Sequence, residues 1–234
     1  MTLHRLPLLL LLLAAPGFAQ APDPGPANKR ADRPALPTVT FTVDWPQGAK
    51  PQHYALKLDS SGRAAYTSVD DTTNPGEPYG LEFIVSDSAR DRIFSAARQL
   101  NYFNGNFDFT KHKIAFTGTK TLGYSDPQRS SQTTFNWSEN AGLMDVTHWL
   151  QAICATIAYG RQLEHDLRYD RLSLNSDLKS LEQAAQDNFV AELHSIEPVL
   201  RQIADNPNVL DLARQRARHL LRLAAQETSA QPSQ

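Results

Sequence analysis

Near Asn140 the hydrophobic periodicity of the chain changes from mainly that of strands to that of helices throughout, and this change constrains the fold more than any other feature. Before it, apolar side chains alternate with polar ones, as Val39, Phe41 and Val43 do, which is typical of half-buried strands. After it, they recur with the 3.6-residue period of amphipathic helices. Because strands and helices are segregated along the chain, the sequence favours an α+β fold over a doubly wound parallel sheet.

In the first half we expect an antiparallel meander of about five or six strands with one inserted helix. The strands are expected near residues 39–43, 54–58, 64–68, 81–85, 114–124 and 134–137, the fifth being a strand or a hairpin around Gly118. The turn at residues 59–62 ends in a glycine and joins the clearest hairpin. Ser86 or Ser88 is expected to cap the inserted helix, whose apolar face includes Ile93 and Ala97.

The second half is expected to begin with one long helix that packs on the sheet, from Leu143 through about Leu167. Further apolar stripes predict helices over residues 174–185, 189–203 and 207–221. Pro198 lies inside the third stripe, so it either kinks that helix or starts a new one capped by Ser195. Asn206 followed by proline is a start signal for the last helix. These helices form a C-terminal hairpin or small bundle.

Composition divides the chain into five segments. Residues 1–21 have a positive start, an apolar run too short to span a membrane, and small residues for cleavage near Ala19 or Ala21, which is the plan of a secretory signal peptide. A proline-rich linker (22–37), an α+β domain (38–170), a C-terminal helical region (171–225) and a disordered tail (226–234) follow. The sequence therefore predicts a soluble periplasmic or secreted protein.

Charge and cysteine content narrow the partners and the source of stability. The formal net charge is −2, which gives no electrostatic reason to expect nucleic acid as a partner. Cys154 is the one cysteine, so the chain has no internal disulfide. Its place in the long helix predicts a small buried hydrophobe rather than a nucleophile. No second long apolar stretch follows the signal, so we expect no membrane span in the mature chain.

We expect neither a metal nor a cofactor. Zinc sites usually show histidines a few residues apart, but no two of the seven histidines are closer than 17 positions. Asp145 and His148 share a helix face and are the best general-base pair that the chain offers. They support an alternative function, an exported hydrolase with a site assembled from distant residues around His148.

The aromatic loop over residues 101–109 is the strongest candidate for a binding site. Its rings interleave with amide side chains, and binding proteins pair flat rings with amide hydrogen bonds because rings give contact area at a low entropy cost. An alternative interpretation is that two or three rings fill the core. The predicted partner-binding residues are Tyr102, Phe103, Asn104, Phe107 and Phe109.

Two segments resemble known folds. The Tyr54-x-Leu56-x-Leu58 strand, the turn ending in Gly62 and the strand-to-helix unit give the β-rich half a resemblance to small secreted bacterial domains of unknown function, which implies no activity. Residues 193–221 resemble one helix–turn–helix unit of an α-solenoid. A solenoid needs about three units, so we interpret this one as an αα-hairpin. The sequence as a whole predicts a non-enzymatic binding or scaffolding module of the cell envelope, with a protein or glycan partner.

Overall fold

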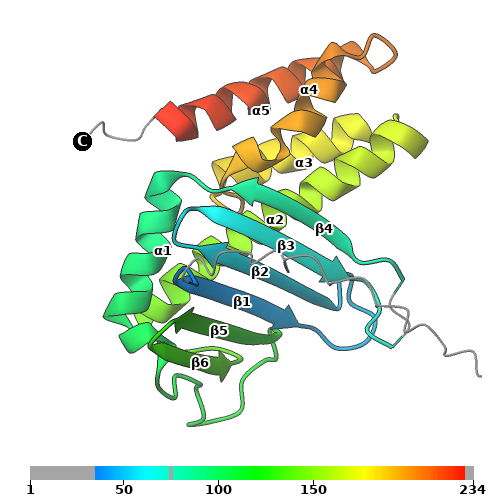
Figure 1. Ribbon diagram of the computed structural model, residues 1–234. Coiled ribbons are helices and arrows are strands. Elements are labelled where there is room, and N and C mark those ends of the chain that lie inside the picture. The colour runs from blue at the N-terminus through cyan, green and yellow to red at the C-terminus, as the bar shows by residue number, and fades with distance from the viewer. Residues whose placement is uncertain (1–34, 74–75, 230–234) are drawn as a thin grey trace, which may run out of the picture. The chain divides into compact units, whose positions relative to one another are not determined.

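Six strands form one antiparallel sheet: β1 (Thr38–Asp44), β2 (His53–Asp59), β3 (Arg63–Val69), β4 (Tyr79–Ile84), β5 (Thr119–Asp126) and β6 (Arg129–Phe135). Their order across the sheet is β4-β3-β2-β1-β5-β6 (Figure 1). The chain builds outward from β1 to β4 and then returns to place β5 on the other side of β1. This antiparallel α+β arrangement confirms the predicted fold class.

The computed structural model describes residues 35–73 and 76–229, with side chains up to residue 227. The predicted signal peptide, most of the linker and the end of the predicted tail lie outside these residues.

Alternation along the strands determines which face of the sheet is covered. Val39, Phe41 and Val43 are buried, and Phe41 pairs with Leu56 on β2 and with Leu122 on β5. Helices α1 (Asp87–Gln99) and α2 (Ala141–Tyr169) cover this face (Figure 1). A shift of one residue in register would turn every apolar side chain to the open face, so the alternation fixes the register.

Side-chain caps start both of the helices that cover the sheet. The Ser86 hydroxyl accepts a hydrogen bond from the Ala89 amide at the start of α1, as one of the two predicted caps requires. The Asn140 side chain accepts one from the Leu143 amide at the start of α2. Because α2 is 29 residues long, it extends beyond the sheet and also packs against the C-terminal helices. The predicted long helix is confirmed.

The C-terminal region consists of α3 (Leu174–Gln186), the short helix η2 (Leu193–Ile196), α4 (Glu197–Asp205) and α5 (Asp211–Ser229). Its apolar faces form a second hydrophobic cluster, which Leu163 of α2 joins. Helix α5 extends to Ser229, into the segment predicted as a tail.

A new helix, α4, begins at Glu197 with Pro198 in its first turn. This agrees with one of the two predicted alternatives, a new helix rather than a kink. The predicted cap at Ser195 is wrong, because the Ser195 hydroxyl is buried and has no hydrogen-bond partner among the described residues. Phe189 was expected on the apolar face of this helix, but it lies in the preceding linker with 68% of its surface exposed.

The predicted starts of two other elements are also wrong. The last helix begins at Asp211 rather than at residue 207, because the Asn206 side chain accepts the Asn208 amide and closes a local turn instead. Strand β5 begins at Thr119 rather than at residue 114. The Asn136 side chain binds the Thr117 amide and the Ala115 carbonyl, so this stretch bonds to a side chain rather than to a strand.

Candidate binding site

Three consecutive residues with left-handed backbone follow α1, and none of them is glycine. Asn101, Tyr102 and Phe103 form the short helix η1 (Asn101–Phe103) with φ values of 50°, 57° and 63°. This conformation costs about 1–2 kcal/mol per non-glycine residue, so the surrounding structure must hold it. Phe103 is completely buried, and the Ser131 hydroxyl donates to the Tyr102 carbonyl at 2.6 Å. The strained turn therefore has a fixed position against the sheet.

The Tyr102 ring is held between two other side chains. The Arg129 guanidinium carbon lies 4.0 Å from the ring centre, and the Tyr124 ring centre lies 4.7 Å away at an interplanar angle of 52°. The Tyr124 hydroxyl donates to Asp126, which also pairs with Arg129. Burial and the neighbouring Asp126 carboxylate raise the pKa of Tyr124, so its hydroxyl keeps its proton at neutral pH.

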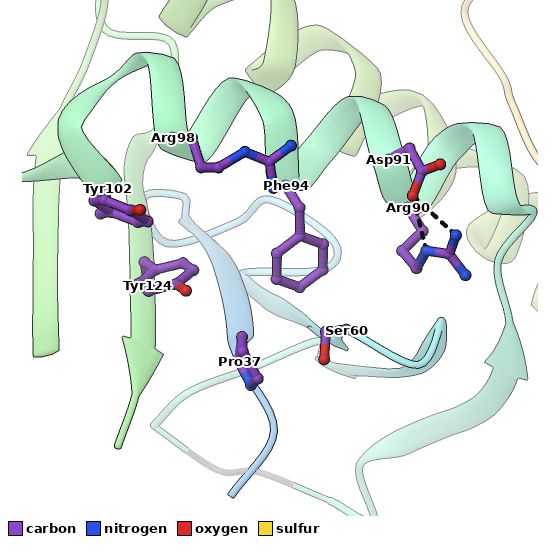
Figure 2. Close-up of a pocket in the computed structure, with 8 residues that line it drawn as sticks. All are labelled: Pro37, Ser60, Arg90, Asp91, Phe94, Arg98, Tyr102 and Tyr124. Atoms are coloured by element: carbon purple, nitrogen blue, oxygen red, sulfur yellow. Dashed lines mark hydrogen bonds and ion pairs between the residues drawn. The ribbon is translucent and has the colours of Figure 1, made fainter. Parts of the chain in front are cut away.

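A cavity of about 260 Å³ opens beside Tyr102. Figure 2 shows Phe94 and Arg98 projecting from α1, with the two tyrosines at one side. The lining residues are Pro37, Ser60, Arg90, Asp91, Phe94, Arg98, Tyr102 and Tyr124. They come from the segment before β1, the β2–β3 turn, α1, η1 and β5, so only the folded chain brings them together.

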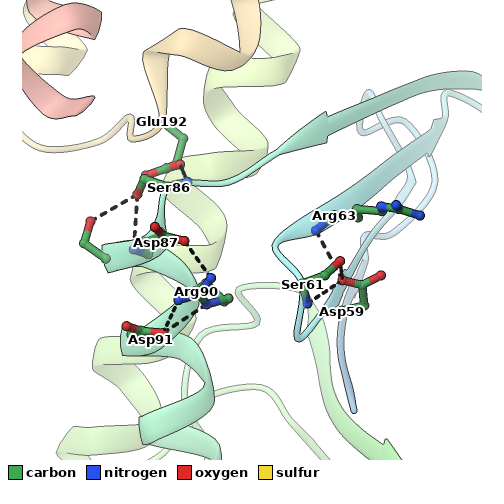
Figure 3. Close-up of polar contacts among 10 residues, drawn as sticks. Asp59, Ser61, Arg63, Ser86, Asp87, Arg90, Asp91 and Glu192 are labelled. Carbon is green, nitrogen blue, oxygen red and sulfur yellow. Dashed lines mark hydrogen bonds and ion pairs between the residues drawn. The ribbon is translucent and has the colours of Figure 1, made fainter. Parts of the chain in front are cut away.

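The two arginines on the α1 wall differ in their pairing. Arg90 donates to Asp87 at 2.6 Å and to Asp91 through two nitrogens at 3.0 and 2.9 Å (Figure 3). The Arg98 guanidinium has no hydrogen bond or ion pair with any residue of the described ranges. The cavity therefore combines aromatic walls with one guanidinium that has no protein partner in the described part of the chain.

The five predicted site residues do not share one surface. Tyr102 lines the cavity, whereas Phe103 is in the core. Asn104 is exposed. Phe107 and Phe109 line a separate hollow of about 330 Å³.

The aromatic rings that line this second hollow, Phe107 and Phe109, already pack against other side chains of the protein. Phe107 packs against the hydrophobic core, and the Phe109 ring makes edge contacts with the rings of Trp137 and His112, with ring centres 5.2 and 4.7 Å apart. Sequence reasoning missed Phe94, Arg98 and Tyr124. A charged residue in the last turn of a helix and a tyrosine on an alternating strand carry no local signal of a site.

The residues of the hydrolase alternative have other partners. Asp145 pairs with Arg92 at 2.9 Å. His148 lines a hollow of about 530 Å³ with Tyr54 and Gln151, among others, but this lining includes no carboxylate, thiol or serine.

A fourth cavity, of about 360 Å³, does gather His165, Ser68 and Asp70. However, Asp70 accepts two hydrogen bonds from Arg161, at 3.0 and 2.9 Å. The His165 Nδ1 atom lies 3.2 Å from Asp166. Within residues 35–73 and 76–229, no histidine forms a hydrogen bond with a serine hydroxyl or a thiol.

Cys154 is buried in α2, as predicted, and burial raises the pKa of its thiol. The described residues include no group of three His, Cys, Asp or Glu side chains that could hold a metal ion. Among the helices of the described ranges, none combines the length and the apolar character that crossing a membrane requires.

Comparison of the chain with protein-family models gives no match, and comparison with curated proteins gives none either. The site is therefore interpreted from its own geometry.

Proposed function

We propose that this protein is an exported, non-enzymatic binding module of the cell envelope that holds its partner at the cavity beside Tyr102. The strained backbone at Tyr102 carries the proposal. Three adjacent left-handed residues reduce stability, and strain of this kind clusters at binding and active sites, where it positions a side chain for contact. Here it positions the Tyr102 ring at the rim of a cavity.

The location of the cavity supports the same function. Pro37 lines it, so the cavity lies where the predicted proline-rich linker joins the first strand. A leader of this composition gives a domain reach from an export site or a membrane surface. Export itself rests on the signal-like composition of residues 1–21. The partner is a protein or a glycan of the envelope.

The hydrolase alternative has less support. It needs a base in contact with a nucleophile. His148 and Asp145, its proposed pair, make no contact with each other among the hydrogen bonds and ion pairs of the described residues. The geometry favours binding because three consecutive left-handed residues adjoin an aromatic cavity that Arg98 also lines, and its guanidinium has no partner among the described residues.

The test is affinity capture from envelope extract with the full mature chain, residues 22–234. A Tyr102→Asn variant removes the ring but keeps a residue type that tolerates left-handed backbone. Tyr169→Asn is the matched control, because Tyr169 is 75% exposed and lies on α2, away from the cavity. We expect the wild type and Tyr169→Asn to retain the same partner and Tyr102→Asn to lose it. Equal retention by all three proteins would place binding elsewhere.

A further inference from the structure

We infer that the cavity beside Tyr102 binds a carboxylate attached to an apolar group, and that this group is the C-terminal residue of a peptide chain. The inference rests on the proposed function, because it names the chemistry of the partner at that same site. It follows from the charge, the walls and the size of the cavity.

The charged side chains around the cavity favour a ligand with a single negative charge. The Arg90 guanidinium pairs with two carboxylates, Asp87 and Asp91, so this group carries one excess negative charge, whereas the Arg98 guanidinium has no partner among the described residues. One free guanidinium offers one positive charge, and its planar donors match the two oxygens of a carboxylate. The excess negative charge of Asp87 and Asp91 would repel a doubly charged ligand more strongly than a singly charged one. A monocarboxylate therefore fits better than a phosphate monoester.

The aromatic and proline side chains that line the cavity favour a ligand with an apolar group. Phe94 lies on the helix side of the cavity, Tyr124 lies on the strand side, and Pro37 closes it opposite the helix (Figure 2). A ligand that places an apolar side chain between these walls removes its own surface and theirs from water. The volume of about 260 Å³ is slightly below the range typical of drug-sized ligands, about 300–1,000 Å³. It therefore suits about one residue.

The aromatic geometry favours a peptide over an acidic sugar. Sugar binding on a tyrosine uses an open ring face. One face of Tyr102 is occupied by the Arg129 guanidinium at 4.0 Å, and the Tyr124 ring packs beside it at 4.7 Å. Arg129 therefore covers one face of Tyr102, and the Tyr124 hydroxyl is already bonded to Asp126, which leaves less open ring surface for a sugar. A carboxyl-terminal residue needs only the apolar walls and the guanidinium.

The probes are an octapeptide ending in phenylalanine with a free carboxylate and the same peptide with a C-terminal amide. Three small molecules are also tested. N-acetylphenylalanine and its amide represent a small free acid and its neutral form, and glucuronate represents an acidic sugar. Binding to the full mature chain is measured by isothermal titration calorimetry. We expect the peptide acid to bind at least about tenfold more tightly than its amide and more tightly than N-acetylphenylalanine. Arg98→Gln should weaken binding of the acid to the level of the amide, and Arg98→Lys should recover part of the difference.

Arg168→Gln is the control, because Arg168 is also an exposed arginine near a helix end and lies on α2, away from the cavity. If Arg98 only complements the dipole of α1, Arg98→Gln will lower the melting temperature without changing the ratio of acid to amide affinity. That result would overturn the inference. Equal binding of the acid and the amide by the wild type would also overturn it, and so would a failure of the wild type to bind either peptide. Tighter binding of glucuronate than of the peptide would replace the peptide with a glycan acid. Tighter binding of N-acetylphenylalanine would replace it with a small free acid.

The two proposals fail in different ways. Loss of the carboxylate preference, together with Tyr102-dependent capture of a partner, would remove the carboxylate inference and leave the proposed function intact. Capture that does not depend on Tyr102 would remove the proposed function itself.

Discussion

The Glu192 carboxylate accepts two hydrogen bonds from Ser86, from its amide at 2.6 Å and from its hydroxyl at 2.7 Å, across 106 residues of sequence (Figure 3). Ser86 is the N-cap of α1, and Glu192 lies in the linker after α3 with a left-handed backbone and 5% exposure. Beside them, His194 Nε2 lies 2.7 Å from the Ile84 carbonyl oxygen. These contacts attach the C-terminal helices to the junction between β4 and α1.

Replacing Glu192 should therefore destabilise the whole fold. Hydrogen bonds to a charged group contribute about 1.5–3 kcal/mol, so Glu192→Ala is expected to lower the free energy of unfolding by about 2–3 kcal/mol and Glu192→Gln by less. Urea unfolding followed by circular dichroism measures this. Glu82→Gln, at an exposed position on β4, is the control. An unchanged midpoint for Glu192→Ala would mean that the contact with Ser86 contributes little.

A pair of aspartates should make stability depend on pH. Asp166 on α2 is buried, and Gln162 donates to it at 2.9 Å. Burial opposes its ionisation, but hydrogen bonds from Asp177, His165 and Gln162 outweigh burial and hold the pKa of Asp166 below its usual value. Burial, followed by the hydrogen bond to Asp166 and its negative charge, raises the pKa of Asp177 to about 6. Asp177 thus holds a proton more tightly in the folded state than in the unfolded chain.

The raised pKa sets the direction of the effect. The stabilising contribution of Asp177 is fully present below about pH 4, the usual pKa of the unfolded residue, and is lost as pH rises through about 6. Asp177→Asn mimics the protonated form, so it should raise the melting temperature at pH 7.5 by about 2–4 °C and leave it unchanged at pH 4. Differential scanning calorimetry at both pH values checks this, with the exposed Asp205→Asn as the control. An equal effect at both pH values would contradict the raised pKa of Asp177.

Gly160 allows α2 to approach η2 closely. A Cβ atom at this position would overlap the Cγ2 atom of Ile196, which is itself buried and branched. Gly160→Ala should therefore destabilise the protein by about 2 kcal/mol, although alanine favours helix by about 1 kcal/mol. Gly142→Ala on the same helix is the matched control, because a Cβ atom there meets nothing closer than 3.5 Å. Thermal unfolding should separate the two variants, and equal melting temperatures would mean that Ile196 moves aside freely.

Lys120 fixes the end of the loop that follows the candidate site. It is 3% exposed, and its ammonium group donates to the carbonyls of Thr117, Gly118 and Asn136 at 2.8, 3.0 and 2.8 Å. Burial lowers the pKa of Lys120.

Lys120→Met should remove the ammonium donor from the Thr117 and Gly118 carbonyls, whereas the Asn136 carbonyl still accepts from the Thr117 hydroxyl, and it should cost about 3 kcal/mol. We also expect faster proteolysis within residues 104–118, measured by limited digestion and mass spectrometry. Lys113→Met, at an exposed position in the same segment, should change neither quantity. Unchanged cleavage of Lys120→Met would show that the loop is held by its other contacts.

The sequence determines the local elements of this protein because their signals are local. Alternation places Phe41 in the core, and the apolar stripe around Ile153 gives a helix that buries Cys154. Predictions failed where one side chain redirected the backbone. Asn206 closed a turn instead of starting a helix, and Asn136 bound residues that otherwise read as a strand.

Only the tertiary structure decides the site. The sequence pointed to Tyr102 as one of a cluster of loop aromatics, but Phe103 is in the core and Phe109 faces a different hollow. Tyr102 instead lines a cavity with Arg98 and Tyr124, which belong to α1 and β5. Periodicity reports which neighbours along one element share a face. It does not report which elements meet, because strand register and helix packing depend on the burial of the whole core.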